Sequence, residues 1–133
     1  MELGHILVVE DDVRIREMVR NMLQSHGARV AEASTGEEAL AALKRNGPFE
    51  MVVLDLLIPP PTGLRVMSLV RAAHDDTPFV VITGAADDDL RATVAEMGKA
   101  VVLAKPFLMD DLLAVMGRLR ADTEAMGSSE EAT

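Results

Sequence analysis

Five short apolar segments alternate with longer amphipathic segments along this chain of 133 residues. Four of the short segments are unbroken apolar runs rich in β-branched residues, a pattern typical of buried parallel strands. The fifth, Arg29–Ala33, alternates polar and apolar positions, which predicts a strand at a sheet edge. The four unbroken runs cover residues 6–9, 51–54, 79–82 and 101–104.

Between these strands, apolar residues recur three and four positions apart and predict five helices. Asp12 is the expected N-cap of the first helix, and Gly27 its expected end. Thr35 and Glu38 have the spacing of a capping box at the start of the second helix. The other helices are predicted around the apolar residues of 64–70, 90–97 and 112–119, with Asp87, Asp88 and Asp89 in the first turn of the fourth.

Strands that alternate with helices through short links predict right-handed crossovers and a parallel sheet covered on both faces. The predicted fold is therefore of the α/β class, a three-layer α/β/α sandwich with five strands and five helices. We expect one domain over residues 1–121. Residues 122–133 are rich in Glu, Ser and Gly and predict a flexible acidic tail.

The composition of the chain argues against several classes of function. The net charge of −9 argues against direct nucleic-acid binding, because such binding needs Lys and Arg to neutralise phosphates. The absence of cysteine excludes disulfides and thiol catalysis. No segment has the length and apolar character of a membrane span or a signal peptide, so we expect a cytoplasmic protein without membrane contact.

Reactive polar residues follow the four apolar runs. Glu10 and Asp11 follow the first, Asp55 the second, Thr83 the third and Lys105 the fourth. In open α/β sheets, ligands bind beyond the carboxyl ends of the strands. We therefore expect these five side chains to gather at one edge of the sheet.

The expected cluster has a defined chemistry. Two bare carboxylates about 4 Å apart repel by roughly 4 kcal/mol at an effective dielectric near 20. Lys105 supplies a single positive charge, so three acids call for a further cation, and oxygen ligands of this kind suit Mg2+. Asp55 is the candidate nucleophile toward phosphorus, while Lys105 and Thr83 are candidates to hold the oxygens of a transferred phosphoryl group.

With these motifs the chain resembles the receiver domain of the bacterial two-component response regulators, over roughly residues 4–121. The resemblance implies a flavodoxin-like fold with strand order 2-1-3-4-5 and a cis peptide before Pro106. It rests on four short stretches: Val8 to Asp12, Asp55 with Pro59 and Gly63, Thr83-Gly84, and Lys105-Pro106-Phe107.

The resemblance also implies a role for each site residue. Asp55 would accept a phosphoryl group from a sensor histidine kinase or a phosphotransfer protein, gripped by Thr83 and Lys105. Asp11, Asp55 and the backbone carbonyl of Leu57 would ligate Mg2+, with Glu10 assisting through water. The chain would be a switch rather than an enzyme, a monomer or weak dimer that meets a downstream protein through its fourth helix, fifth strand and fifth helix.

Several positions depart from the family pattern. Val102 replaces the usual aromatic residue three before Lys105, and Thr62 replaces the common Asp before Gly63. Val102 motivates the alternative of a degenerate receiver that binds partners without phosphorylation. Leu57 and Ala85 cannot orient a hydrolytic water by hydrogen bonding, which predicts slow self-dephosphorylation. Leu57 also disfavours a phosphatase of the haloacid dehalogenase type, which needs a second Asp there.

Overall fold

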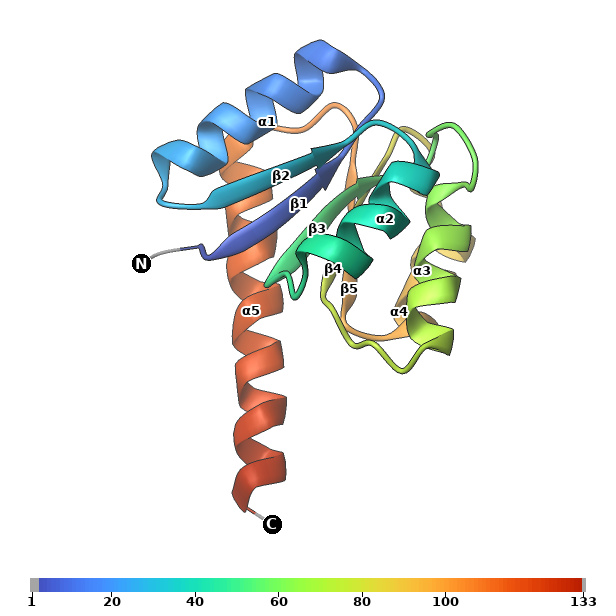
Figure 1. The fold of residues 1–133 in the computed structure, drawn as a ribbon. Helices are drawn as coiled ribbons and strands as arrows, with labels where there is room; N and C mark the ends of the chain where they lie inside the picture. The colour runs from blue at the N-terminus through green and yellow to red at the C-terminus, as the bar shows by residue number, and fades with distance from the viewer. Residues whose placement is uncertain (1–2, 133) are drawn as a thin grey trace.

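The structure is a computed structural model that describes the backbone of residues 3–132 and the side chains of residues 3–122. Strands and helices alternate strictly along the described chain (Figure 1). The strands are β1 (His5–Val9), β2 (Arg29–Ala33), β3 (Met51–Asp55), β4 (Phe79–Thr83) and β5 (Ala100–Ala104). The helices are α1 (Val13–Ser25), α2 (Gly36–Asn46), α3 (Gly63–Ala72), α4 (Asp88–Met97) and α5 (Met109–Ala132).

All five strands pair in parallel in the order β2-β1-β3-β4-β5, as the sequence predicts. The alternating strand β2 lies at one edge, and β5 at the other. The order reverses direction at β1, which lies between β2 and β3. Such a reversal opens a crevice beyond the carboxyl ends of β1 and β3, and ligands bind there in folds of this kind.

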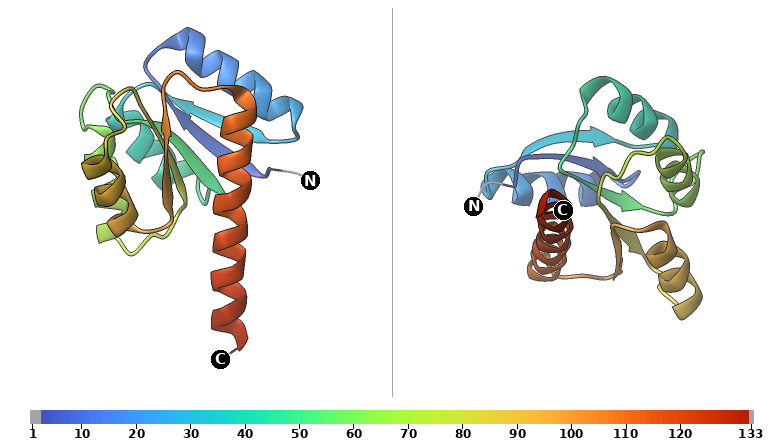
Figure 2. Two further views of the ribbon diagram at one scale, coloured as in Figure 1. Left: turned by 180° about the vertical axis from the view of Figure 1, so that it is seen from behind. Right: turned by 90° about the horizontal axis from the view of Figure 1, so that it is seen from below.

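Helices cover both faces of the sheet, which confirms the three-layer sandwich. Residues of α2, α3 and α4 pack on one face around Leu54 and Val81. Residues of α1 and α5 pack on the other face around Val53 and Val80. The view from behind in Figure 2 has α1 and α5 in front of the sheet and α2 behind it. Alternate residues of β3 and β4 thus face opposite cores, so these central strands are apolar up to their last residues, Asp55 and Thr83.

The predicted capping residues of α1 and α2 are confirmed. The side chain of Asp12 accepts hydrogen bonds from the backbone amides of the first turn of α1, and Thr35 accepts one from Glu38 N–H. Asp87 is the N-cap of α4 rather than a first-turn residue, because its carboxylate accepts from Leu90 N–H. The peptide bond between Lys105 and Pro106 is cis, as expected.

The last helix is longer than the sequence pattern indicates. We place a domain boundary at residue 121 and a tail beyond it, whereas α5 continues to Ala132 and extends past the body of the domain (Figure 1). The side chains of 123–133 lie outside the described residues. Among the helices that the structure describes, none is both long and apolar enough to cross a bilayer.

Candidate functional site

The loops that follow β1, β3, β4 and β5 gather at the same end of the sheet, the upper end in Figure 1. Val9 pairs with Leu54 in the β1–β3 register, so Glu10 and Asp55 leave the sheet side by side. Carboxylate oxygens of Glu10, Asp11 and Asp55 lie within 4.8 Å of one another. The structure therefore brings the three predicted acids together.

Burial differs among the three acids. Glu10 and Asp55 are each only 5% exposed, while Asp11 is open to solvent. A buried carboxylate needs a hydrogen-bond or charge partner, because burial without one is costly. Asp55 receives a hydrogen bond of 2.9 Å at Oδ1 from Leu57 N–H. The cluster thus has two enclosed carboxylates and one at the mouth.

Lys105 reaches this cluster from the far edge of the sheet. Its Nζ lies 2.6 Å from Asp55 Oδ2 and 3.0 Å from Glu10 Oε1, so one ammonium bridges two of the acids. The backbone supports this reach, because Lys105 N–H donates to the carbonyl of Thr83 at 2.8 Å. The Lys105 ammonium is thus held beside the position that a divalent cation or the oxygen of a phosphoryl group would occupy.

The packing of the cluster shifts two pKa values. Burial, reinforced by the neighbouring Asp55 carboxylate, raises the pKa of Glu10 to about 7 against the partial opposition of Lys105. For Lys105, burial acts to lower the pKa, but the contacts with Asp55 and Glu10 outweigh it and the net shift is upward. The site thus holds a firmly charged ammonium beside a carboxyl group that titrates near neutrality.

Thr83 is the last residue of β4 and is 3% exposed. In the β3–β4 register Ile82 lies opposite Asp55, so Thr83 is the next residue beyond that pair. Its Oγ1 accepts a hydrogen bond of 3.1 Å from Ala85 N–H, which leaves the hydroxyl proton available to another acceptor. An oxygen held near Asp55 is such an acceptor.

The donor set fits Mg2+. Magnesium prefers oxygen ligands, takes one or two carboxylates and retains several waters. Here three carboxylates converge, one of them open to solvent, and the ammonium of Lys105 already lies against the two buried ones. These residues could hold the ion together with the Leu57 carbonyl, whose part stays a prediction.

One contact of the site was not anticipated from the sequence. Arg16 Nη1 donates a hydrogen bond of 2.8 Å to the backbone carbonyl of Glu10. A signal was present, because side chains in the first turn of a helix point back toward its N-terminus. An arginine four residues after Asp12 is therefore within reach of the preceding acidic turn.

An apolar groove of about 390 Å3 lies beside the cluster. Leu56, Leu57 and Leu64 line it from the β3 side, and Ala85 and Leu90 from the β4 side. Leu57 is 77% exposed, so its side chain stands at the entrance rather than in the core. Leu57 and Ala85, the residues predicted to flank a hydrolytic water, therefore line the same apolar groove.

The fold and the site together define a class of protein. It is a doubly wound α/β domain whose strand ends gather acids, a hydroxyl and a lysine suited to bind a divalent cation and a phosphoryl group. A comparison with family models matches residues 6–116 to the response regulator receiver domain. The chain belongs to this family, whose members are phosphoryl-accepting signalling modules.

Individual relatives agree with this assignment. The chain is 38% identical over 128 residues to the response regulator MprA of Mycolicibacterium vanbaalenii, covering 96% of this chain and 55% of MprA. The HemR receiver domain of Leptospira biflexa superposes with a TM-score of 0.80 at 32% identity, covering 88% of this chain and 94% of HemR. The chemotaxis response regulator CheY4 of Vibrio cholerae also gives 0.80, at 29% identity, over 88% and 98% of the two chains.

The share of each relative that is covered differs. The chain spans nearly all of the HemR and CheY4 structures but only about half the length of MprA. The activity and partners of whole MprA are therefore not assigned to this chain.

Proposed function

We propose that this receiver domain is a phosphorylation-operated switch of a two-component system or phosphorelay. Asp55 accepts a phosphoryl group from a phosphohistidine on a sensor kinase or phosphotransfer protein, and the modified domain changes its affinity for a downstream protein. The observation that carries this proposal is the contact of Lys105 with Asp55 and Glu10 inside a cluster of three acids. A merely structural ion pair would need one acid, not three.

The transfer would proceed by attack of an Asp55 carboxylate oxygen on phosphorus. A P–O bond forms as the bond from phosphorus to the donor nitrogen breaks, and its electron pair returns to the imidazole. Lys105 pairs with one phosphoryl oxygen, and Thr83 donates its hydroxyl proton to another. Asp11, Asp55 and the Leu57 carbonyl would hold Mg2+, with Glu10 assisting through water, and the ion would supply the further positive charge that three acids and a phosphoryl group need.

The first test measures whether Asp55 becomes covalently phosphorylated. The protein is incubated with acetyl phosphate and Mg2+, and its intact mass is measured. We expect addition of a single phosphoryl group in the wild-type protein and none in Asp55→Asn, which keeps the shape of the side chain without its nucleophilic oxygen. Addition that persists in the variant would place the phosphoryl group elsewhere and reject Asp55 as acceptor.

The output surface is the face formed by α4, β5 and α5, and the chain acts as a monomer or weak dimer. Val102, buried on β5 where the family has an aromatic side chain, favours a second candidate function, a receiver that binds its partner regardless of phosphorylation. Partner affinity measured with and without beryllofluoride and Mg2+ separates the two. A difference supports the switch, and equal affinities support the constitutive module. The cytoplasmic location stays a prediction.

A further inference from the structure

Arg16 connects the acidic turn to the edge strand. The residue lies one turn into α1, with its side chain only 18% exposed. Its Nη1 donates to the backbone carbonyl of Glu10 at 2.8 Å, and its Nε donates to Glu32 Oε1 at 3.3 Å. One guanidinium therefore joins the β1–α1 turn, helix α1 and strand β2.

The contact acts on the peptide unit between two of the acids. The carbonyl of Glu10 belongs to the peptide bond that joins Glu10 to Asp11, so fixing this oxygen fixes the plane of that bond. On the other side of the residue, Glu10 N–H donates to the carbonyl of Ala33 at 3.0 Å. Both backbone polar groups of Glu10 are thereby held, and the direction in which Asp11 leaves the turn is set.

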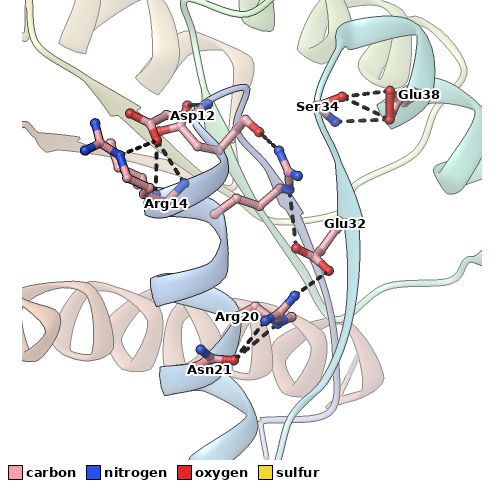
Figure 3. A network of polar contacts seen from close by, with 10 residues as sticks. Asp12, Arg14, Arg20, Asn21, Glu32, Ser34 and Glu38 are labelled. Carbon is pink, nitrogen blue, oxygen red and sulfur yellow. Dashed lines mark hydrogen bonds and ion pairs between the residues drawn. The ribbon is translucent and has the colours of Figure 1, made fainter.

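Glu32 holds Arg16 in place. Its Oε1 accepts from Arg16, and its Oε2 accepts from Arg20 Nη1 at 3.2 Å, an arrangement visible for Arg20 and Glu32 in Figure 3. An isolated exposed ion pair contributes little to stability. A guanidinium, however, is a rigid planar fork, so a partner on Nε also fixes where Nη1 points. Glu32 thus aims the Arg16 Nη1–H at Glu10.

We infer that Arg16, oriented by Glu32, is a positioning residue for the metal ligands Glu10 and Asp11. This inference rests on the proposed function, because it assigns Arg16 a part in cation binding at the same site. Residues that orient metal ligands from behind them typically change metal affinity by about 10–100-fold when replaced. Arg16 has this relation to the turn without lying among the predicted ligands.

Charge and geometry predict opposite results for Arg16→Met. Loss of a nearby cation on its own would strengthen Mg2+ binding, because the site becomes more negative. Loss of the hydrogen bond to Glu10 would weaken binding, because the turn is no longer held. We expect the geometric effect to win and the dissociation constant for Mg2+ to rise about tenfold.

Arg20→Met is the matched control. Arg20 bonds to the same Glu32 and carries the same charge, but its other hydrogen bonds go to Asn21 rather than to the acidic turn (Figure 3). We expect its dissociation constant for Mg2+ to stay within about twofold of the wild-type value. Arg16→Lys keeps the charge but lacks the fork, and we expect it to bind Mg2+ as weakly as Arg16→Met.

The measurement is titration calorimetry of the unphosphorylated protein with Mg2+, with amide NMR shifts of residues 10–12 as a second readout. Thermal unfolding without metal shows whether each variant is folded. If Arg16→Met does not fold, the Mg2+ affinities of Arg16→Lys and Glu32→Gln are measured in its place. The inference is overturned if the folded Arg16 variants bind Mg2+ as the wild type does, or if Arg16→Lys restores full affinity. A wild-type protein that ignores Mg2+ would instead reject the proposed function.

Discussion

Lys105 and Asp55 are separated by fifty residues in the sequence, yet Lys105 Nζ lies 2.6 Å from Asp55 Oδ2. The same ammonium lies 3.0 Å from Glu10 Oε1, so Lys105 is a cationic partner of both buried acids. It therefore plays two opposing parts. It offsets the acids in the metal-free protein, and under the proposed function it would turn toward the phosphoryl oxygens when Asp55 is modified.

Replacing Lys105 should separate these two parts. In Lys105→Met the cluster loses its positive charge, so we expect Mg2+ to bind about tenfold more tightly. Phosphoryl transfer from acetyl phosphate should nevertheless slow by about 100-fold, because a donor to the developing charge is gone. Calorimetry measures the first quantity and intact mass against time the second. Lys44→Met, an equal charge change on the exposed end of α2, should alter neither.

The raised pKa of Glu10 predicts a pH-dependent cation affinity. With a pKa of about 7 in the folded protein, Glu10 holds a proton that Mg2+ must displace. We expect the affinity for Mg2+ to rise by up to about tenfold per pH unit below neutrality and to level off above it. Calorimetry in two buffers of different ionisation enthalpy would detect the released proton, and Glu10→Gln should release none.

The same shift has a consequence for stability without metal. Because the folded pKa lies above the usual value of 4.5, the folded protein holds a proton that the unfolded chain releases between about pH 4.5 and 7. The contribution of Glu10 to stability is therefore greatest below pH 4.5 and is lost as the pH rises to 7. Urea unfolding in EDTA across this range should show the loss in wild type and a smaller one in Glu10→Gln.

Leu57 offers a test of signal lifetime. Leu57 stands at the entrance of the apolar groove that Ala85 also lines, and neither of these two side chains can orient a water toward phosphorus by hydrogen bonding. We expect Leu57→Asn to lose its phosphoryl group about tenfold faster, because an amide can position that water. Decay is followed by intact mass after the phosphoryl donor is removed. A wild-type decay as fast as that of Leu57→Asn would contradict slow self-dephosphorylation.

The predicted strands and most of the predicted helix starts agree with the structure, because each depends on residues that are close together in the sequence. A buried parallel strand is an unbroken apolar run, as at 79–82, and a helix start needs a capping side chain such as Asp12 or Thr35. The apolar pattern of the fifth helix stops at Leu119, so it does not indicate how far beyond that residue α5 continues. Residues after 121 include Ala and Glu, which favour helix, and no proline stops the helix there.

Only those contacts of the site that follow from the order and direction of the strands could be predicted from the sequence. Parallel strands bring their carboxyl ends together, so the meeting of Glu10, Asp55 and Lys105 followed from their places after three strands. The contact of Arg16 with the Glu10 carbonyl did not follow. It joins a side chain to a backbone atom, and such a contact leaves no trace in the hydrophobic pattern.

Arg71 is a second arginine that binds backbone carbonyls, far along the chain from the acidic cluster. From α3 its Nε donates to Met97 O, and its Nη2 donates to Gly98 O at 2.8 Å. Two further hydrogen bonds reach Lys99 O and Asp75 O, and the guanidinium lies 5.2 Å from the centre of the Phe79 ring. The cation thus joins the C-terminal ends of α3 and α4, where the helix dipoles favour positive charge.

Removing this clamp should be costly. Arg71→Met leaves several partly buried carbonyls without their donor, and we expect a loss of about 3 kcal/mol in the free energy of unfolding. Arg71→Lys keeps the charge but cannot span both helix ends, so it should lose about half as much. The exposed Arg65 on the same helix is the control, and Arg65→Met should change stability by no more than about 0.5 kcal/mol. Urea denaturation measures all three. Equal stabilities of Arg71→Met and Arg65→Met would show that water replaces the guanidinium without cost, and that the turn before β5 is held by its own backbone.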